Sequence, residues 1–107
     1  MRIALCDDNK EFQTKLYDKL CASKLLPEPE FYKFNCAEDL IKSIKMSNFF
    51  SIIFLDIEME GINGIEATKI IKEKSPKTVI VFVTNYGEYA IDAFDCDACG
   101  YLLKDFS

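Results

Sequence analysis

Residues 51–56 read Ser-Ile-Ile-Phe-Leu-Asp, an apolar run that stops at an aspartate. Residues 79–83, Val-Ile-Val-Phe-Val, form a second run of the same kind. Each run is apolar at consecutive positions, so both faces of the strand that it forms must be buried. Strands of this kind lie inside a parallel sheet that helices cover on both sides. The two runs therefore predict an α/β fold.

Around these runs, short strands alternate with segments of helical periodicity. Phe12, Leu16 and Leu20 recur at the spacing of one helix face. The pattern predicts strands at 2–6, 30–35, 51–56, 78–84 and 100–103, and helices at 10–23, 37–46, from the glycine loop at 61–64 to 74, and at 87–94. We therefore predict one domain over residues 1–107. Right-handed crossovers between the strands limit its topology, and the sheet is expected to be doubly wound, parallel and five-stranded.

Composition narrows the class of protein. The chain has 107 residues, of which 50% are hydrophobic and 29% charged, as in a small globular domain. Its net charge of −5 and the lack of a basic stripe argue against direct contact with nucleic acid. The apolar runs are too short to cross a membrane, and no signal-peptide pattern opens the chain, so a cytoplasmic location is expected. Without histidine, His-based metal sites and Ser-His triads are excluded.

Polar side chains stand where four of the predicted strands end. Asp7 and Asp8 follow the first strand, Asp56 the third, Thr84 the fourth and Lys104 the fifth. In open parallel α/β sheets, ligands bind at the carboxyl ends of the strands. The sequence therefore predicts that three carboxylates, a hydroxyl and an ammonium group meet at this edge.

That set of groups fits phosphoryl chemistry with a divalent cation. Carboxylates in close proximity repel one another, and Mg²⁺ relieves the repulsion while keeping room for a phosphate oxygen. Lys104 and Thr84 can contact phosphoryl oxygens, and one carboxylate can act as a nucleophile to give an acyl phosphate. Asp56, alone at the end of a central strand, is the best candidate. Taken singly, Asp8 and Thr84 could equally cap helices, and Lys104 could be a solvated lysine.

Several motifs resemble the receiver domains of two-component response regulators, with matching spacing over essentially the whole chain. They are Cys-Asp-Asp-Asn at 6–9, Phe-Leu-Asp-Ile-Glu-Met at 54–59, Asn-Gly-Ile-Glu at 63–66, Val-Thr at 83–84 and Tyr-Leu-Leu-Lys at 101–104. The resemblance implies the flavodoxin-like strand order 2-1-3-4-5. It also implies a phosphorylation-dependent switch, not an enzyme acting on a separate substrate, which needs Mg²⁺ and takes its phosphoryl group from a sensor histidine kinase.

The resemblance also assigns roles at the metal and at the acceptor. By the motif match, Asp56 is the phosphoacceptor and a metal ligand. Asp8 resembles the direct Mg²⁺ ligand and Asp7 the ligand that acts through water. The backbone carbonyl of Glu58 matches the remaining protein ligand.

The last two motifs correspond to the switch residues of the family. Thr84 and Lys104 match the residues that contact the phosphoryl group, and Tyr101 matches the aromatic residue that turns inward on activation. Residues 84–94 are similar to receivers that precede a LytTR-type DNA-binding domain. DNA would then be reached only through that output domain, which these 107 residues do not include.

Two departures from the family pattern bear on the fifth strand. Asp105 stands where the family usually has a proline after the lysine, and the family's fifth helix is missing from this chain. Part of residues 79–83 and 101–103 should then be uncovered. We therefore expect the chain to self-associate, for example as a homodimer, through this strip.

Other functions remain open on the sequence alone. A phosphohydrolase with an aspartate nucleophile would usually carry a second aspartate two residues on, where Glu58 stands. A receiver-like interaction module that has lost phosphorylation is a further alternative. Cys96 and Cys99 form a CxxC pair, but it does not follow a strand at a helix start, as thioredoxin-like motifs do, and no second pair completes a zinc site.

Overall fold

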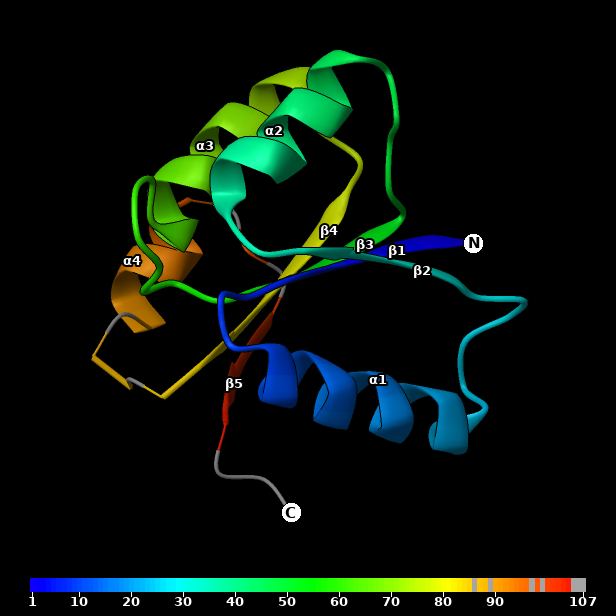
Figure 1. Ribbon diagram of the computed structural model, residues 1–107. Helices are drawn as coiled ribbons and strands as arrows, with labels where there is room; N and C mark the ends of the chain where they lie inside the picture. Colours follow the sequence, from blue (N-terminus) through cyan, green and yellow to red (C-terminus); the bar gives the residue numbers. More distant parts are fainter. Residues whose placement is uncertain (86, 89, 97, 99, 105–107) are drawn as a thin grey trace.

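The computed structural model describes residues 1–85, 87–88, 90–96, 98 and 100–104, and it has the predicted architecture. Five parallel strands form one sheet in the order β2-β1-β3-β4-β5, with helices on both sides (Figure 1). The elements are β1 (Arg2–Cys6), α1 (Lys10–Ser23), β2 (Glu30–Phe34), α2 (Ala37–Lys45), β3 (Ile52–Leu55), α3 (Gly64–Lys74), β4 (Val79–Thr84), α4 (Ala90–Asp95) and β5 (Gly100–Leu103).

Most predicted boundaries are confirmed to within a residue or two, and α4 is the exception. The helix begins at Ala90, three residues after the predicted start, because Gly87 and Glu88 lie in a bend and a turn. Glycine has a high entropic cost in a helix, which favours a turn at this place. Two residues noted in the sequence, Cys99 and Asp105, lie outside the described residues.

The register of the sheet brings the carboxyl ends of the strands to one edge. Cys6 lies opposite Leu55, Leu55 opposite Phe82, and Thr84 opposite Leu103. The residues that follow these strands therefore have to be neighbours, whatever their side chains are. β2 is an edge strand, as its charged residues predict.

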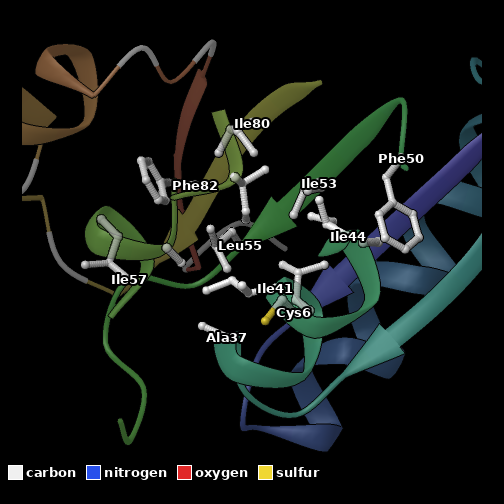
Figure 2. Close-up of a cluster of buried hydrophobic side chains, with 14 of the residues drawn as sticks. Cys6, Ala37, Ile41, Ile44, Phe50, Ile53, Leu55, Ile57, Ile80 and Phe82 are labelled. Atoms are coloured by element: carbon white, nitrogen blue, oxygen red, sulfur yellow. The ribbon is translucent and has the colours of Figure 1, made fainter. Parts of the chain in front are cut away.

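The larger core lies between the sheet and helices α2, α3 and α4, which all cover the same face (Figure 1). Figure 2 shows side chains of β3 and β4, such as Ile53, Leu55 and Phe82, among those of the covering helices. Phe82, Ile53 and Leu55 are fully buried. The consecutive apolar residues of the central strands make this possible.

On the opposite face, α1 is the one helix among the described residues (Figure 1). Its cluster of buried side chains is smaller, and it comprises Ile3, Leu5, Phe12, Leu16 and Val83. A groove of about 550 Å³ remains beside α1, lined by Leu16, Lys19, Leu20, Phe54, Tyr101, Leu102 and Leu103. Leu102 and Leu103 are 46% and 42% exposed, so part of the strip is uncovered, as the sequence predicts. No helix in the described part of the chain is long and apolar enough to cross a membrane.

Candidate functional site

Backbone hydrogen bonds extend the sheet beyond its strands and fix the site residues. The N–H of Asp7 donates to the carbonyl of Phe34 (3.0 Å), and the N–H of Asp56 donates to the carbonyl of Cys6 (3.0 Å). The N–H of Lys104 donates to the carbonyl of Thr84 (2.8 Å). Each side chain at the strand ends therefore starts from a backbone that the neighbouring strand holds in place.

The three predicted carboxylates do come together. Asp7, Asp8 and Asp56 each offer an oxygen atom, and these atoms lie within 4.8 Å of one another. Asp7 and Asp56 are buried at 5% and 6% exposure, whereas Asp8 is exposed. Two of the carboxylates are thus buried, and the third faces solvent.

Lys104 bridges the two buried carboxylates. Its Nζ lies 2.7 Å from Oδ2 of Asp7 and 3.1 Å from Oδ2 of Asp56. A lysine in this position partly offsets the repulsion between the two carboxylates. The residue predicted to contact a phosphoryl group therefore lies within hydrogen-bond distance of the predicted acceptor.

The charges in this cluster influence one another's protonation. Burial raises the pKa of the Asp56 carboxyl above its usual range, and the charge of Asp7 raises it further, while Lys104 opposes both effects. Burial alone would lower the pKa of Lys104, but its hydrogen bonds and the charges of Asp7 and Asp56 outweigh that effect and raise it. The ammonium is therefore firmly protonated, and the buried acid carries an unfavourable charge that a cation would relieve.

The first turn of α1 holds the loop that carries Asp7. Oδ1 of Asp7 accepts a hydrogen bond from the N–H of Asn9 (2.9 Å), and Asn9 caps the helix by accepting from the N–H of Phe12 (3.1 Å). Nε2 of Gln13 donates both to the carbonyl of Asp7 (2.8 Å) and to that of Phe34 (2.6 Å). Gln13 was not predicted as a site residue, although a glutamine beside the apolar residues Phe12 and Leu16 of a helix is a signal that could have found it.

The loop between β3 and α3 depends on a glycine next to Asp56. The N–H of Gly64 donates to the carbonyl of Ile57 (2.8 Å). A Cβ at Gly64 would collide with the carbonyl oxygen of Asp56 and lie 2.9 Å from Cα of Ile57. The close approach of helix α3 to the backbone of Asp56 and Ile57 therefore requires a residue without a side chain.

The same loop borders an open cleft beside the carboxylates. The cleft has a volume of about 540 Å³, and both Asp8 and Glu58 line it. Next to Gly61, a lining residue whose φ is +82°, Oε2 of Glu38 accepts a hydrogen bond from the N–H of Ile62 (2.9 Å). This hydrogen bond also lowers the pKa of Glu38. Glu58 is thus placed at the predicted metal side of the site.

The remaining predicted residues lie around the cluster. The Thr84 side chain is fully buried at the end of β4. Tyr101 is half-buried and packs edge-on against Phe82, with ring centroids 6.4 Å apart. Cys96 is buried, and its thiol donates to the carbonyl of Ala93 (3.3 Å), as expected of a packed residue.

Comparison with known proteins gives a match to the family model described as "Response regulator receiver domain" over residues 3–107. The chain is 42% identical over 72 residues to the sensory transduction protein LytT of Bacillus anthracis, which covers 67% of this chain and 29% of LytT. It is 31% identical over 108 residues to LytR of Streptococcus mutans, covering 99% of this chain and 43% of LytR. The chain thus spans less than half of these regulators, and the matches agree with the LytTR-type branch.

Solved structures agree with the sequence matches. The response regulatory domain of mrkE from Klebsiella pneumoniae has a TM-score of 0.87 and 27% identity, covering 100% of this chain and 85% of that one. The response regulator TrrA from Thermotoga maritima, solved in complex with Mg²⁺-BeF, has a TM-score of 0.85 and 28% identity, covering 99% and 88%. With a family match that extends over nearly all its residues, this chain belongs to the response regulator receiver domain family.

Proposed function

We propose that this domain is a phosphorylation-dependent signalling switch that accepts a phosphoryl group on Asp56 from a sensor histidine kinase. The observation that carries the proposal is the position of Asp56. Its carboxylate ends a central strand, lies 3.1 Å from the ammonium of Lys104 and shares a cluster with Asp7 and Asp8. A nucleophile, a cationic contact and a metal-binding set are therefore present within one small site.

The charges of the cluster fit Mg²⁺. Three carboxylates and one lysine leave two negative charges uncompensated, which matches a divalent cation. In this proposal Asp8 and Asp56 bind the ion directly, Asp7 acts through water, and the carbonyl of Glu58 completes the protein ligands. The bound ion would offset negative charge on the phosphoryl oxygens. The likeness to TrrA, solved with Mg²⁺-BeF, supports this assignment.

The chemistry needs a nucleophile and a cation near the transferred group. A carboxylate oxygen of Asp56 attacks the phosphorus of the kinase's phosphohistidine, the P–N bond breaks, and the imidazole leaves with the bonding electrons and gains a proton. Lys104 then exchanges its contact with Asp56 Oδ2 for a phosphoryl oxygen while it stays paired with Asp7. Water later attacks the phosphorus, the P–O bond to Asp56 breaks, and inorganic phosphate leaves as the carboxylate is restored.

The readout of the switch would pass through Thr84 and Tyr101. Thr84 would donate a hydrogen bond to a phosphoryl oxygen, and Tyr101, which packs on Phe82, would change its packing with it. The similarity to LytT and LytR supports a cytoplasmic transcription regulator whose DNA-binding output domain follows the receiver in the whole protein.

Incubation with acetyl phosphate and Mg²⁺, followed by intact-mass analysis, tests the proposal. We expect one added phosphate in the wild-type protein and none in Asp56→Ala or in excess EDTA. Asp18→Ala, which removes an exposed acid of α1, is the matched control and should be phosphorylated normally. A folded protein that gains no phosphate would contradict the proposal and favour the phosphorylation-independent interaction module.

A further inference from the structure

Lys104 directly follows β5, a strand at the edge of the sheet. β5 pairs with β4 alone among the described strands, and Leu102 and Leu103 are 46% and 42% exposed. Its backbone is anchored by the hydrogen bond from the N–H of Lys104 to the carbonyl of Thr84, but several rotatable bonds lie between that anchor and the ammonium. The position of the ammonium has to come from contacts at the side chain's own tip.

One of these contacts is an aromatic ring. Nζ of Lys104 lies 4.6 Å from the centroid of the Phe12 ring, in addition to its two carboxylate partners. The face of an aromatic ring attracts a cation, and the attraction is stronger where water is excluded. Phe12 is 8% exposed, so the contact is largely shielded from solvent.

The ring is itself fixed in place. Phe12 belongs to the first turn of α1, where its N–H is bound by the capping side chain of Asn9. Its side chain is part of the buried cluster that includes Leu16 and Val83. Helix α1 thus presents a capped and buried ring to the ammonium of a lysine that follows an edge strand.

We propose that Phe12 is a positioning residue for Lys104, and this inference rests on the proposed phosphorylation of Asp56. When Asp56 Oδ2 becomes part of the acyl phosphate, Lys104 must leave that oxygen and meet a phosphoryl oxygen instead. Asp7 and the Phe12 ring, which both contact the ammonium, would keep it close to Asp56 during this exchange. Phe12 therefore assists phosphoryl transfer through Lys104 without touching the transferred group.

The test compares three variants in the full chain. Phe12→Leu keeps an apolar side chain and removes the ring, Phe12→Tyr keeps the ring, and Phe31→Leu removes another ring packed on the same cluster, away from Lys104. The rate of phosphorylation by acetyl phosphate is measured at saturating Mg²⁺, and the Mg²⁺ affinity is measured separately. We expect Phe12→Leu to slow phosphorylation roughly 3- to 10-fold, with Mg²⁺ affinity changed less than about twofold.

Phe12→Tyr should restore most of the rate, and Phe31→Leu should leave it unchanged. In a Lys104→Gln background, Phe12→Leu should have no further effect, because the two residues act together. An equal slowing in both backgrounds, or no slowing at all in wild-type background, overturns the inference. If the wild-type protein is not phosphorylated, the proposed function fails and the inference fails with it.

A measurement on the wild-type protein covers the case in which Phe12→Leu does not fold. The ring current of Phe12 should shift the Lys104 Cε proton resonances upfield of those of exposed lysines, and Phe12→Tyr should preserve the shift. Lys104 resonances at ordinary positions in the folded protein would contradict the contact itself.

Discussion

The two faces of the sheet are covered to different extents. On one face α2, α3 and α4 bury side chains such as Phe82, Leu55 and Ile53 completely (Figure 2). On the other face α1 covers β1, while Phe54 of β3 and the residues of β5 line the groove of about 550 Å³. The closed face therefore supplies most of the hydrophobic stabilisation that the described residues provide.

The open face carries part of the candidate site. Lys104 extends from β5, the strand at the border of the groove, and meets Phe12 of α1 on this side of the sheet. Asp7 and Asp56 lie at the strand ends, where the two faces meet. In the proposed mechanism Lys104 exchanges one contact for another, and the candidate site lies next to the less covered face of the sheet.

The largest expected difference between the two faces is in the free energy of unfolding that is lost when an aromatic ring is removed. Phe82→Ala on the closed face should lower the free energy of unfolding by about 3 to 5 kcal/mol, through lost burial and a cavity. Phe54→Ala, on the open face beside the groove, should cost about half as much, because that ring is only partly buried. Urea denaturation of both variants checks this, and equal losses would show that the two faces are equally packed.

The next largest expected effect is the stabilisation of the folded protein by Mg²⁺, which would bind at the strand ends where the two faces meet. A cation present at 100 times its Kd should stabilise the wild-type protein by about 2.7 kcal/mol if it binds only the folded state. A tenfold weaker affinity in Asp8→Ala would reduce this to about 1.4 kcal/mol at the same Mg²⁺ concentration. Thermal unfolding with and without Mg²⁺ measures the difference. Asp18→Ala serves as control, and a full Mg²⁺ effect in Asp8→Ala would exclude Asp8 as a ligand.

The contrast between the faces was partly predictable from the sequence. The apolar runs at 51–56 and 79–83 predicted the buried central strands, and the crossover rule predicted helices α2, α3 and α4 on one side. The same rule leaves α1 as the one described helix on the other side, and this accounts for the exposure of Leu102 and Leu103. The start of α4 was predicted too early, because helical periodicity extends through Gly87 and does not register its cost in a helix.

The site was predictable where topology alone determines it. Parallel strands bring Asp7, Asp56 and Lys104 together at one edge, so their residue types and positions in the chain were sufficient. The contacts of Phe12 and Gln13 were not foreseen, because periodicity tells which face a residue occupies and not which atom it meets. Gly64 was read as a loop marker, whereas its closeness to the Asp56 carbonyl depends on three-dimensional packing. The functional roles of these residues stay predictions until they are tested.

A smaller effect should appear in the pH dependence of stability without metal. The pKa of Asp56 is raised in the folded state, so the folded protein binds more protons than the unfolded chain across this window. Stability should therefore fall as pH rises from the unfolded pKa of about 3.9 through the folded value. Asp56→Asn removes this contribution and should become progressively more stable than wild type over that range. Urea denaturation in EDTA at several pH values checks the sign, and a variant that loses relative stability as pH rises would contradict it.

The smallest change in stability is expected for the groove itself. Leu102 and Leu103 are already 46% and 42% exposed, so Leu102→Gln/Leu103→Gln should alter the free energy of unfolding by less than about 1 kcal/mol. Exposed apolar side chains that line a groove favour association, and self-association through this strip is our expectation for the isolated chain. The double variant should then be more monomeric than wild type in sedimentation experiments.

Met46→Gln, which replaces a 68% exposed side chain at the end of α2, is the matched control and should not change association. A wild-type chain that is already monomeric would show that the open face is no interface between copies. A double variant as destabilised as Phe82→Ala would mean that the groove belongs to the core, and the distinction between the two faces would no longer hold.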